Sequence, residues 1–288
     1  MGAYIRPAAL DEALRALAGG APGGARWVVL AGATDHYPAR VGRVPDENVI
    51  DVTAIAGLRG VEAVDGGWRI GALTTWTDLV ETSLPPLFDG LKAAALAIGG
   101  LQIQARATLA GNVCNASPAA DGVPSLLAMD AAMELASSRG TRRVPIGEFV
   151  VGNRRTLRAA DELVTGIVVP APLADASVRA VFEKLGSRAY LVISIAMVAA
   201  IAEITTDGRI ARARVAVGAC SEVAQRLPTL EAELARRSAT EVAATITDVV
   251  RLEHLADLSP IDDVRGTAAY RREAALELVR RALAGVLR

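Results

Sequence analysis

The sequence contains few of the residues that usually bind metals. Its 288 residues include two cysteines, Cys114 and Cys220, and two histidines, His36 and His254. An ordinary iron–sulfur cluster needs about four thiolates, so the chain cannot build one by itself, and any such cluster would have to lie on a partner chain. The histidines are far apart, and we expect neither to be a metal ligand. This composition argues against a zinc enzyme.

The sequence also lacks an excess of charge and any long apolar run. It has 31 basic and 32 acidic residues, with a formal net charge of -1, so it lacks the basic surface that nucleic acids and anionic membranes attract. No run reaches the ~18 apolar residues that cross a bilayer. Arg6, Asp11 and Glu12 interrupt the amino end, where a signal peptide would be apolar. We therefore expect no membrane span, no nucleic-acid partner and a cytoplasmic location.

What the chain does contain is mostly aliphatic. Hydrophobic residues make up 52% of it and aromatic residues 3%, which is typical of a globular protein with a core of Ala, Val and Leu. The length favours about two domains. The segment Pro170-Ala171-Pro172 is the strongest break, so we predict domains at residues 1–172 and 173–288.

Hydrophobic periodicity and turn residues predict the secondary structure. Helices are expected at residues 10–17, 77–84, 91–98, 125–132, 229–237 and 270–287. Strands are expected at residues 27–30, 49–52, 68–73, 133–135 and 162–169. Residues 179–185, 192–204 and 212–218 fit either a strand or a helix. A loop is expected through Pro38 and Pro45.

Two segments of small residues are the main candidates for a binding site. The first segment, residues 31–40, reads AGATDHYPAR and directly follows the predicted strand at 27–30. The second segment, residues 106–121, reads RATLAGNVCNASPAAD. It has too few large apolar residues for a core strand or helix, so we predict an ordered loop that wraps around a ligand.

The chemistry of both segments suits a phosphate-containing ligand. The backbone can approach a ligand closely, and its N–H groups can bind phosphate, at Gly32, Ala33, Ala110 and Gly111. Further polar groups come from Thr34, Thr108, Asn112, Asn115, Ser117 and Asp121. The spacing matches neither the GxGxxG nor the GxxxxGK[ST] pattern. Spacing alone therefore leaves two interpretations open, a ligand site and a pair of structural turns.

The first segment resembles the AGGTD-type first flavin loop of the FAD subunits of molybdenum hydroxylases, the xanthine dehydrogenase and carbon monoxide dehydrogenase family. TLAGNVCNASPAAD, residues 108–121, resembles their second loop, usually TxGGNxxNASPxxD. YIRP at residues 4–7 and DDVRGTAAYRREAALELVRRAL at 262–283 resemble the opening strand and the closing helix of the family. The resemblance thus covers nearly the whole chain.

The resemblance implies an α+β fold and a set of cofactor contacts. The fold would be an FAD-binding domain of the vanillyl-alcohol-oxidase (PCMH) type, with subdomains at about 1–55 and 56–172, followed by a smaller carboxy-terminal α+β domain. The pyrophosphate would contact Ala31, Gly32, Ala33, Thr34, Asp35, Thr108, Ala110, Gly111 and Asn112, with His36 beside the first of these loops. The ribityl or adenosine portion would contact Asn115 and Asp121. Lys184 matches a family lysine near the cofactor, and Ile195 lies where the family shields one face of the isoalloxazine ring.

The resemblance also implies a role in electron transfer. Such a chain binds FAD non-covalently, and electrons reach the flavin from a large molybdopterin subunit through a small [2Fe-2S] subunit, in a dimer of heterotrimers. The flavin then delivers them to an external acceptor such as NAD⁺, a quinone or O₂. No catalytic acid, base or nucleophile is needed on this chain, and we identify none. We expect Cys114 to be a packing residue, and Arg154 and Arg155 to be solvated loop charges.

Two departures from the family pattern keep alternatives open. Ala33 and Ala110 stand where glycine is more usual, and an alanine forced into positive φ costs about 1–2 kcal/mol, enough to weaken FAD binding about tenfold. One alternative is therefore a non-enzymatic scaffold subunit of the same fold with weak FAD binding. Another is a stand-alone flavin reductase similar to the enolpyruvyl-glucosamine reductase of cell-wall synthesis, although its substrate-binding residues are not identifiable in this sequence.

Overall fold

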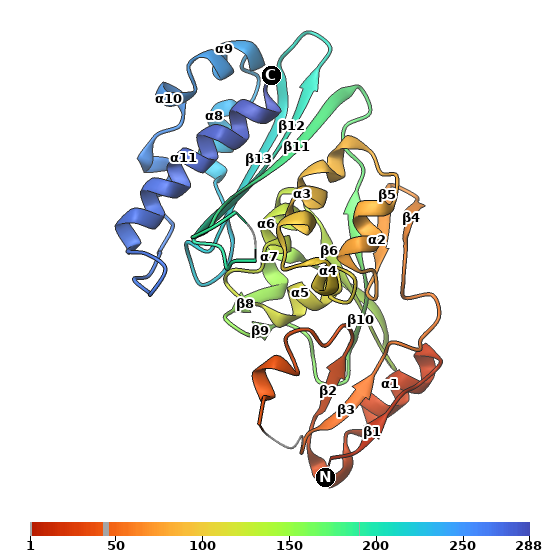
Figure 1. The fold of residues 1–288 in the computed structure, drawn as a ribbon. Coiled ribbons are helices and arrows are strands. Elements are labelled where there is room, and N and C mark those ends of the chain that lie inside the picture. The colour runs from red at the N-terminus through yellow and green to blue at the C-terminus, as the bar shows by residue number, and fades with distance from the viewer. Residues whose placement is uncertain (1, 43–45, 190) are drawn as a thin grey trace.

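The computed structural model describes residues 2–42, 46–189 and 191–288. The chain runs through three successive parts, each with its own sheet (Figure 1). We call them the amino-terminal part, before residue 56, the central part, residues 56–172, and the carboxy-terminal part, after residue 172. Helices and strands are mixed throughout, which confirms the predicted α+β class.

The amino-terminal part is a small parallel sheet covered by one helix. The strand order is β1-β3-β2. Helix α1 buries Ala13, Leu14 and Leu17, one face of its turns, in a core that includes Ile50 of the sheet. Its elements are β1 (Tyr4–Ile5), α1 (Leu10–Gly19), η1 (Pro22–Gly24), β2 (Trp27–Leu30), η2 (Pro38–Arg40) and β3 (Asn48–Asp51).

The central part combines an antiparallel sheet of order β4-β5-β10-β6-β7 with short helices. Trp76, Phe88 and Phe149 are fully buried in its core. The strands of the sheet are β4 (Val61–Val64), β5 (Gly67–Gly71), β6 (Ala132–Ser137), β7 (Gly140–Pro145) and β10 (Leu163–Pro170). A separate small hairpin consists of β8 (Val150–Gly152) and β9 (Arg155–Thr156). The helices of the central part are α2 (Trp76–Glu81), η3 (Pro86–Phe88), α3 (Asp89–Ala97), α4 (Leu101–Gln104), α5 (Leu109–Asn115), α6 (Gly122–Ala128) and α7 (Ile146–Phe149).

The carboxy-terminal part is an antiparallel sheet of order β11-β12-β13-β14 with helices on its outer face. Its strands are β11 (Ala176–Leu185), β12 (Ala196–Thr205), β13 (Ile210–Gly218) and β14 (Gln225–Arg226). Its helices are α8 (Pro228–Leu234), α9 (Ala239–Ala244), α10 (Ile246–Val249), η4 (Leu252–Leu255) and α11 (Ala268–Val286). The helices in the described ranges are all too short or too polar to cross a membrane.

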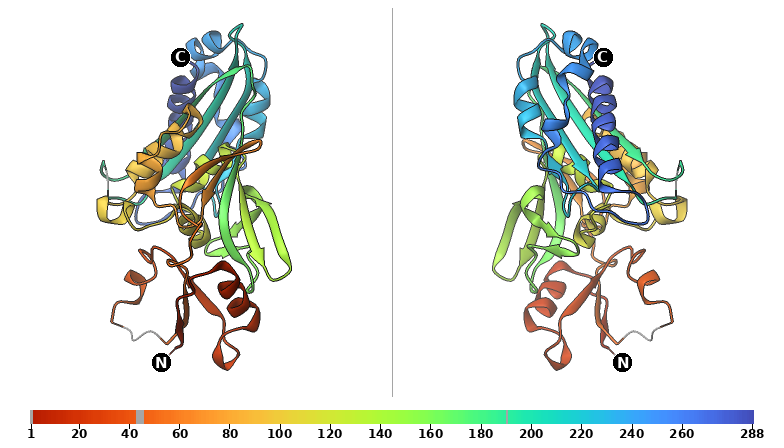
Figure 2. Two further views of the ribbon diagram at one scale, coloured as in Figure 1. Left: turned by 90° about the vertical axis from the view of Figure 1, so that its right-hand side faces the viewer. Right: turned by 90° about the vertical axis from the view of Figure 1, so that its left-hand side faces the viewer.

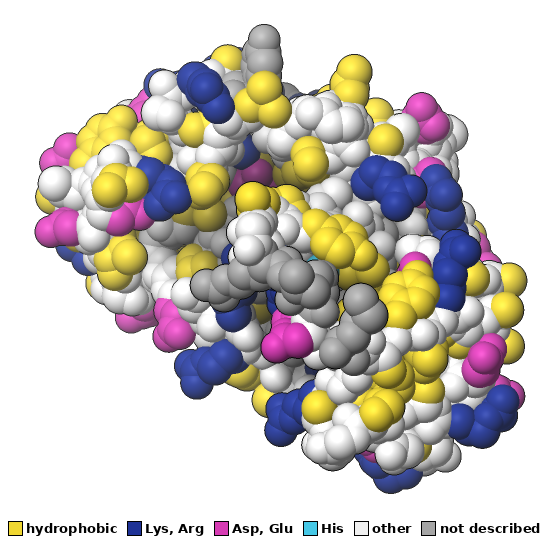
Figure 3. Space-filling model, turned by 60° about the horizontal axis from the view of Figure 1, so that its bottom comes forward, with side chains coloured by type: hydrophobic (Ala, Val, Ile, Leu, Met, Phe, Trp, Pro, Cys, Tyr) yellow, Lys and Arg dark blue, Asp and Glu magenta, His cyan; other side chains and the backbone are white. Residues whose placement is uncertain are grey.

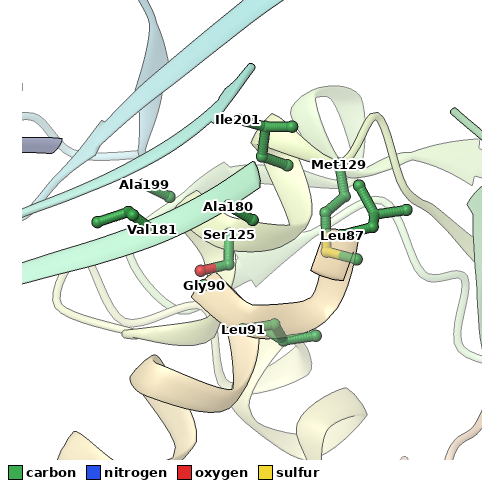
Figure 4. Close-up of a pocket in the computed structure, with 9 residues that line it drawn as sticks. All are labelled: Leu87, Gly90, Leu91, Ser125, Met129, Ala180, Val181, Ala199 and Ile201. Carbon is green, nitrogen blue, oxygen red and sulfur yellow. The ribbon is translucent and has the colours of Figure 1, made fainter. Parts of the chain in front are cut away.

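Strand β12 is buried on both faces and joins two cores. Met197, Ala199 and Ile201 pack into the core of the central part, whereas the alternating residues Val198 and Ala200 pack against the outer helices. Figure 2 shows the sheet between α11 on one side and the central helices on the other. Where α3 and η3 meet β11 and β12, small and apolar residues leave a gap with no room for a water molecule (Figure 4). The carboxy-terminal sheet is therefore packed directly on the central part.

Most predicted elements are present, and the prediction for the second segment is wrong. It is not a continuous loop, because residues 109–115 form α5. The helix predicted at 125–132 runs instead from 122 to 128, since the chain turns at Asp130 (φ 52°) and enters β6. The ambiguous segments at 179–185 and 212–218 lie within strands, and the one at 192–204 becomes strand β12 only from Ala196 onward. The hairpin of β8 and β9 was not predicted, and Pro45 lies outside the described residues.

Candidate cofactor site

The first segment leaves β2 as a tight turn with free backbone donors. Ala33 is in the left-handed region (φ 59°), and the N–H of Tyr37 donates to its carbonyl at 3.3 Å. The N–H groups of residues 32–36 donate to no acceptor among the described residues. A run of adjacent backbone donors without partners is the usual form of an anion-binding nest.

Gly32 brings the first segment against the second. A Cβ atom on Gly32 would lie 2.0 Å from the carbonyl oxygen of Arg106 and 2.9 Å from the Cα of Ala107. Only glycine allows this approach of two backbones. Gly32 and Arg106 are far apart in the sequence, yet the two segments lie against each other here.

In the second segment, Thr108 caps the amino end of α5. Its hydroxyl accepts the N–H of Gly111 at 3.0 Å, which is a standard N-cap. The N–H groups of Thr108 and Ala110 have no acceptor among the described residues. Asn112 is turned toward the protein, since its Oδ1 accepts the N–H of Gly122 at 3.2 Å. Its amide NH₂ group is thus the part that remains for a ligand.

Arg154 ties the two segments together, a role that the sequence did not reveal. Its guanidinium donates to Asp35 Oδ2 at 2.7 Å and to Asn115 Oδ1, and its backbone N–H donates to the carbonyl of Ala116 at 2.9 Å. The side chain is 53% exposed, as expected of a loop charge, but it is paired. It comes from the hairpin of β8 and β9, so no local pattern connects it with either segment.

The His36 side chain, at the end of the tight turn of the first segment, is largely buried. Its side chain is 11% exposed, and its Nε2 lies 3.6 Å from Glu47 Oε2. Burial, with the nearby Arg40 charge, lowers the pKa of His36, so the imidazole is neutral at neutral pH. Arg40 donates to Glu47 through two bonds of 2.7 and 2.5 Å and to the His36 carbonyl at 2.9 Å. His36 thus sits inside a small polar cluster.

Asp121 links the second segment to the carboxy-terminal part. Its carboxylate accepts Lys184 Nζ at 2.7 Å and the hydroxyl of Ser194 at 2.5 Å. Lys184 also donates to the carbonyl of Ala97 at 3.1 Å. Burial raises the pKa of Asp121, and the Lys184 ammonium opposes this rise. Ile195, which follows Ser194, is 5% exposed, so the predicted residues Asp121, Lys184 and Ile195 lie in one neighbourhood.

Cys114 has the properties of a packing residue. It packs against the core of the central part. Burial raises the pKa of its thiol to about 11, so it carries no thiolate at neutral pH.

In the described part of the chain no three His, Cys, Asp or Glu side chains cluster as metal ligands would. The face of the molecule in Figure 3 is hollowed, and it mixes apolar side chains with charges of both signs.

Comparison with known protein families shows to which family the chain belongs. The family profile described as the FAD binding domain in molybdopterin dehydrogenase matches residues 1–172. The chain belongs to this family. A second profile, the CO dehydrogenase flavoprotein C-terminal domain, matches residues 181–286. The resemblance identified in the sequence, the α+β fold and FAD as the cofactor are thereby confirmed.

Individual relatives and a solved structure are similar to the chain over half or more of its length. The xanthine dehydrogenase FAD-binding subunit of Escherichia coli O157:H7 is 36% identical over 175 residues, but the match spans only 58% of this chain and 57% of that protein. The nicotine 6-hydroxylase medium subunit of Paenarthrobacter nicotinovorans is 27% identical over 97% of this chain and 95% of its own length. A solved carbon monoxide dehydrogenase chain from Hydrogenophaga pseudoflava superimposes with a TM-score of 0.84, at 27% identity, over 99% of this chain and 96% of that one.

Proposed function

We propose that the chain holds one FAD non-covalently between the first and second segments, as the medium subunit of a molybdenum hydroxylase. It would pass electrons from iron–sulfur clusters on a small [2Fe-2S] subunit, reduced by a large molybdopterin subunit, through FAD to an external acceptor. The observation that carries the proposal is the run of N–H groups at residues 32–36 that have no acceptor among the described residues, in a segment whose Gly32 lies against the backbone of Arg106. Such an arrangement suits the two negative charges of a pyrophosphate.

Under this proposal, particular residues of both segments would bind particular portions of FAD. The backbone of residues 31–35 and 108–112 would bind the pyrophosphate, and Asn115 and Asp121 would bind the ribityl or adenosine portion. Each carboxylate oxygen of Asp121 keeps a lone pair beyond its bond to Lys184 or Ser194. Bound FAD would supply the redox chemistry, while the chain orients the cofactor, shields it and excludes water. No side chain need transfer a proton.

We predict that acid precipitation of the purified protein releases all of its FAD. Covalent attachment needs a reactive side chain near the ring, and the available ones are unsuitable. His36 is almost enclosed and engaged with Glu47, and the Cys114 thiol, with a pKa of about 11, stays protonated. The measurement is flavin absorbance in the supernatant. Yellow colour that remains in the protein pellet would contradict the prediction.

We further predict that the isolated chain contains no stoichiometric iron or molybdenum and hydroxylates no substrate. It should gain electron input only when co-expressed with a cysteine-rich small chain and a molybdopterin-type large chain, with which it should co-purify as a dimer of heterotrimers. Elemental analysis and flavin reduction by substrate measure this. One equivalent of iron in the chain purified alone would overturn the division of labour.

One observation favours a second candidate function, a scaffold subunit with weak FAD binding. Ala33 lies in the left-handed region, where a Cβ costs about 1–2 kcal/mol. Ala110, by contrast, is an ordinary helical residue, buried to 3% exposure, and carries no such strain. Only one of the two alanine departures therefore bears on affinity, and titration of the purified chain with FAD separates the two functions.

The same two positions provide a matched prediction. Ala33→Gly should relieve the left-handed strain, raise the thermal midpoint of the FAD-loaded protein by a few degrees, and lower the Kd for FAD by up to about tenfold. Ala110→Gly should do the opposite for stability, at a cost of about 1 kcal/mol, because it places glycine inside a helix. Differential scanning calorimetry and FAD titration measure both. Equal shifts for the two variants would show that the strain at Ala33 is of no consequence.

A further inference from the structure

The dipeptide Ser194–Ile195, directly before β12, is held from several sides. The hydroxyl of Ser194 donates to Asp121, at the end of the second segment, at 2.5 Å. The N–H of Ile195 donates to the carbonyl of Leu185 at 2.8 Å. Its carbonyl accepts the guanidinium of Arg271 at 2.6 Å. Both residues are buried, with exposures of 1% and 5%. The dipeptide thus has little freedom to move.

Arg271, which contacts this dipeptide, is a buried charged residue. It lies in the first turn of α11, and its side chain is 4% exposed. Besides Ile195, it donates to the carbonyl of Ala219 at 3.1 Å and to Asp263 Oδ1 at 2.6 Å. Burying a guanidinium is costly, and an ion pair repays that cost poorly, so stability alone is a weak reason to place it there. Its geometric effect is to join α11 to the backbone of Ile195.

The counter-charge of Arg271 is itself preorganised. Asp263 accepts the backbone N–H of Arg265 at 2.8 Å, which with Arg271 and the Arg265 side chain lowers its pKa to about 2. Asp263 is therefore charged across the physiological range, and the link from α11 to Ile195 does not weaken with pH there.

We propose that Arg271 is a positioning residue of the flavin site. Arg271 holds the carbonyl of Ile195, and Asp121 holds the hydroxyl of Ser194. Together these contacts would keep the backbone of this dipeptide rigid where it forms a wall of the site next to the isoalloxazine ring. The inference rests on the proposed function and on the position of the isoalloxazine ring beside Ile195 that the family resemblance implies. It goes beyond that function in giving the closing helix, remote from both cofactor-binding segments in sequence, control over the surroundings of the ring.

The test compares two arginines of the same helix in the full chain loaded with FAD. Arg271→Lys keeps the charge but loses the paired contacts with Ile195 and Ala219. Arg280→Lys is the control, because Arg280 also donates to backbone carbonyls, those of Val250 and Thr247, but has no contact with Ser194–Ile195 among the described residues. We expect Arg271→Lys to shift the visible absorption bands and the midpoint potential of the flavin and to release FAD about tenfold faster. Arg280→Lys should change none of these.

A second variant covers the case in which Arg271→Lys does not fold. Ser194→Ala removes the contact of the same dipeptide with Asp121 and should shift the flavin bands and potential in a similar way. Unchanged flavin spectra and potential in a folded Arg271→Lys, or in Ser194→Ala, would overturn the inference, as would equal changes in Arg280→Lys. If the parent protein takes up no FAD, the proposed function fails and the inference fails with it. A flavin-loaded parent with indifferent variants defeats the inference alone.

Discussion

Gly111→Val is expected to lose FAD while the protein remains folded. A Cβ at this position would lie 2.7 Å from Thr108 Oγ1, so this capping hydroxyl would have to shift; apart from Thr108, the adjacent residues and the backbone of α5, no described atom lies within 4 Å. The branched methyl groups would therefore extend into open space, where we place the pyrophosphate. Losing two charge-assisted N–H bonds of about 1.5–3 kcal/mol each would raise the Kd for FAD by about two to four orders of magnitude.

The control for this prediction lies three residues further on. Cys114→Ser is nearly isosteric, and Cys114 is assigned to packing, so this variant should keep its FAD and lose only about 1–2 kcal/mol of folding stability. Flavin content and thermal melting with and without FAD separate the two effects. If Gly111→Val holds FAD as tightly as the parent, the second segment is structural and the proposed function loses its main support.

Gly32→Ala is expected to disrupt the site by separating its two halves. The added Cβ would lie 2.0 Å from the backbone oxygen of Arg106, so the segments would have to move apart by more than about 1 Å to restore an ordinary contact. Overpacking against rigid backbone typically costs about 1–3 kcal/mol of folding free energy. Because the free donors of residues 32–36 would move with the loop, FAD affinity should fall by about a hundredfold or more.

Gly19→Ala makes the same chemical change where there is room for it. Apart from its neighbours in the chain and the backbone of α1, no described atom lies within 4 Å of a Cβ on Gly19, which ends α1, and alanine in a helix is better than glycine by up to about 1 kcal/mol. This variant should keep full FAD binding and at least the parent stability. Chemical denaturation and FAD titration provide the comparison. Equal behaviour of Gly32→Ala and Gly19→Ala would show that the close approach of the two segments does not matter.

Features that depend on local sequence were predictable. Strand β2 was placed at its observed bounds because an apolar run ends abruptly in small residues. Helix α11 followed from its periodicity, within a residue or two at each end. The prediction that the first and second segments bind one cofactor came from the resemblance to a family and not from spacing, which left a structural pair of turns equally open.

Features that depend on tertiary contacts were not predictable. Helix α5 escaped notice because it buries only Leu109, Ala110 and Val113 and begins at a threonine cap, a pattern too short for periodicity to detect. Arg154 joins Asp35 to Asn115 from a hairpin 39 residues beyond the nearer partner. Nothing near Arg154 in the sequence marks it. The sequence pointed to positive φ at both Ala33 and Ala110, and only the structure shows that Ala33 alone adopts it.

The double-sided burial of β12 bears on how far this protein can be shortened. Residues 1–172 correspond to a named family profile, which invites their expression as a minimal flavoprotein. Yet Met197, Ala199 and Ile201 complete the core beneath α3 and α6, and Lys184 and Ser194 supply the partners of Asp121. A fragment cut at residue 172 would expose an apolar face over α3 and α6 and would leave the Asp121 carboxylate without its partners, so it would tend to aggregate. A smaller version would need a redesigned surface over α3 and α6 before it could serve as a soluble module.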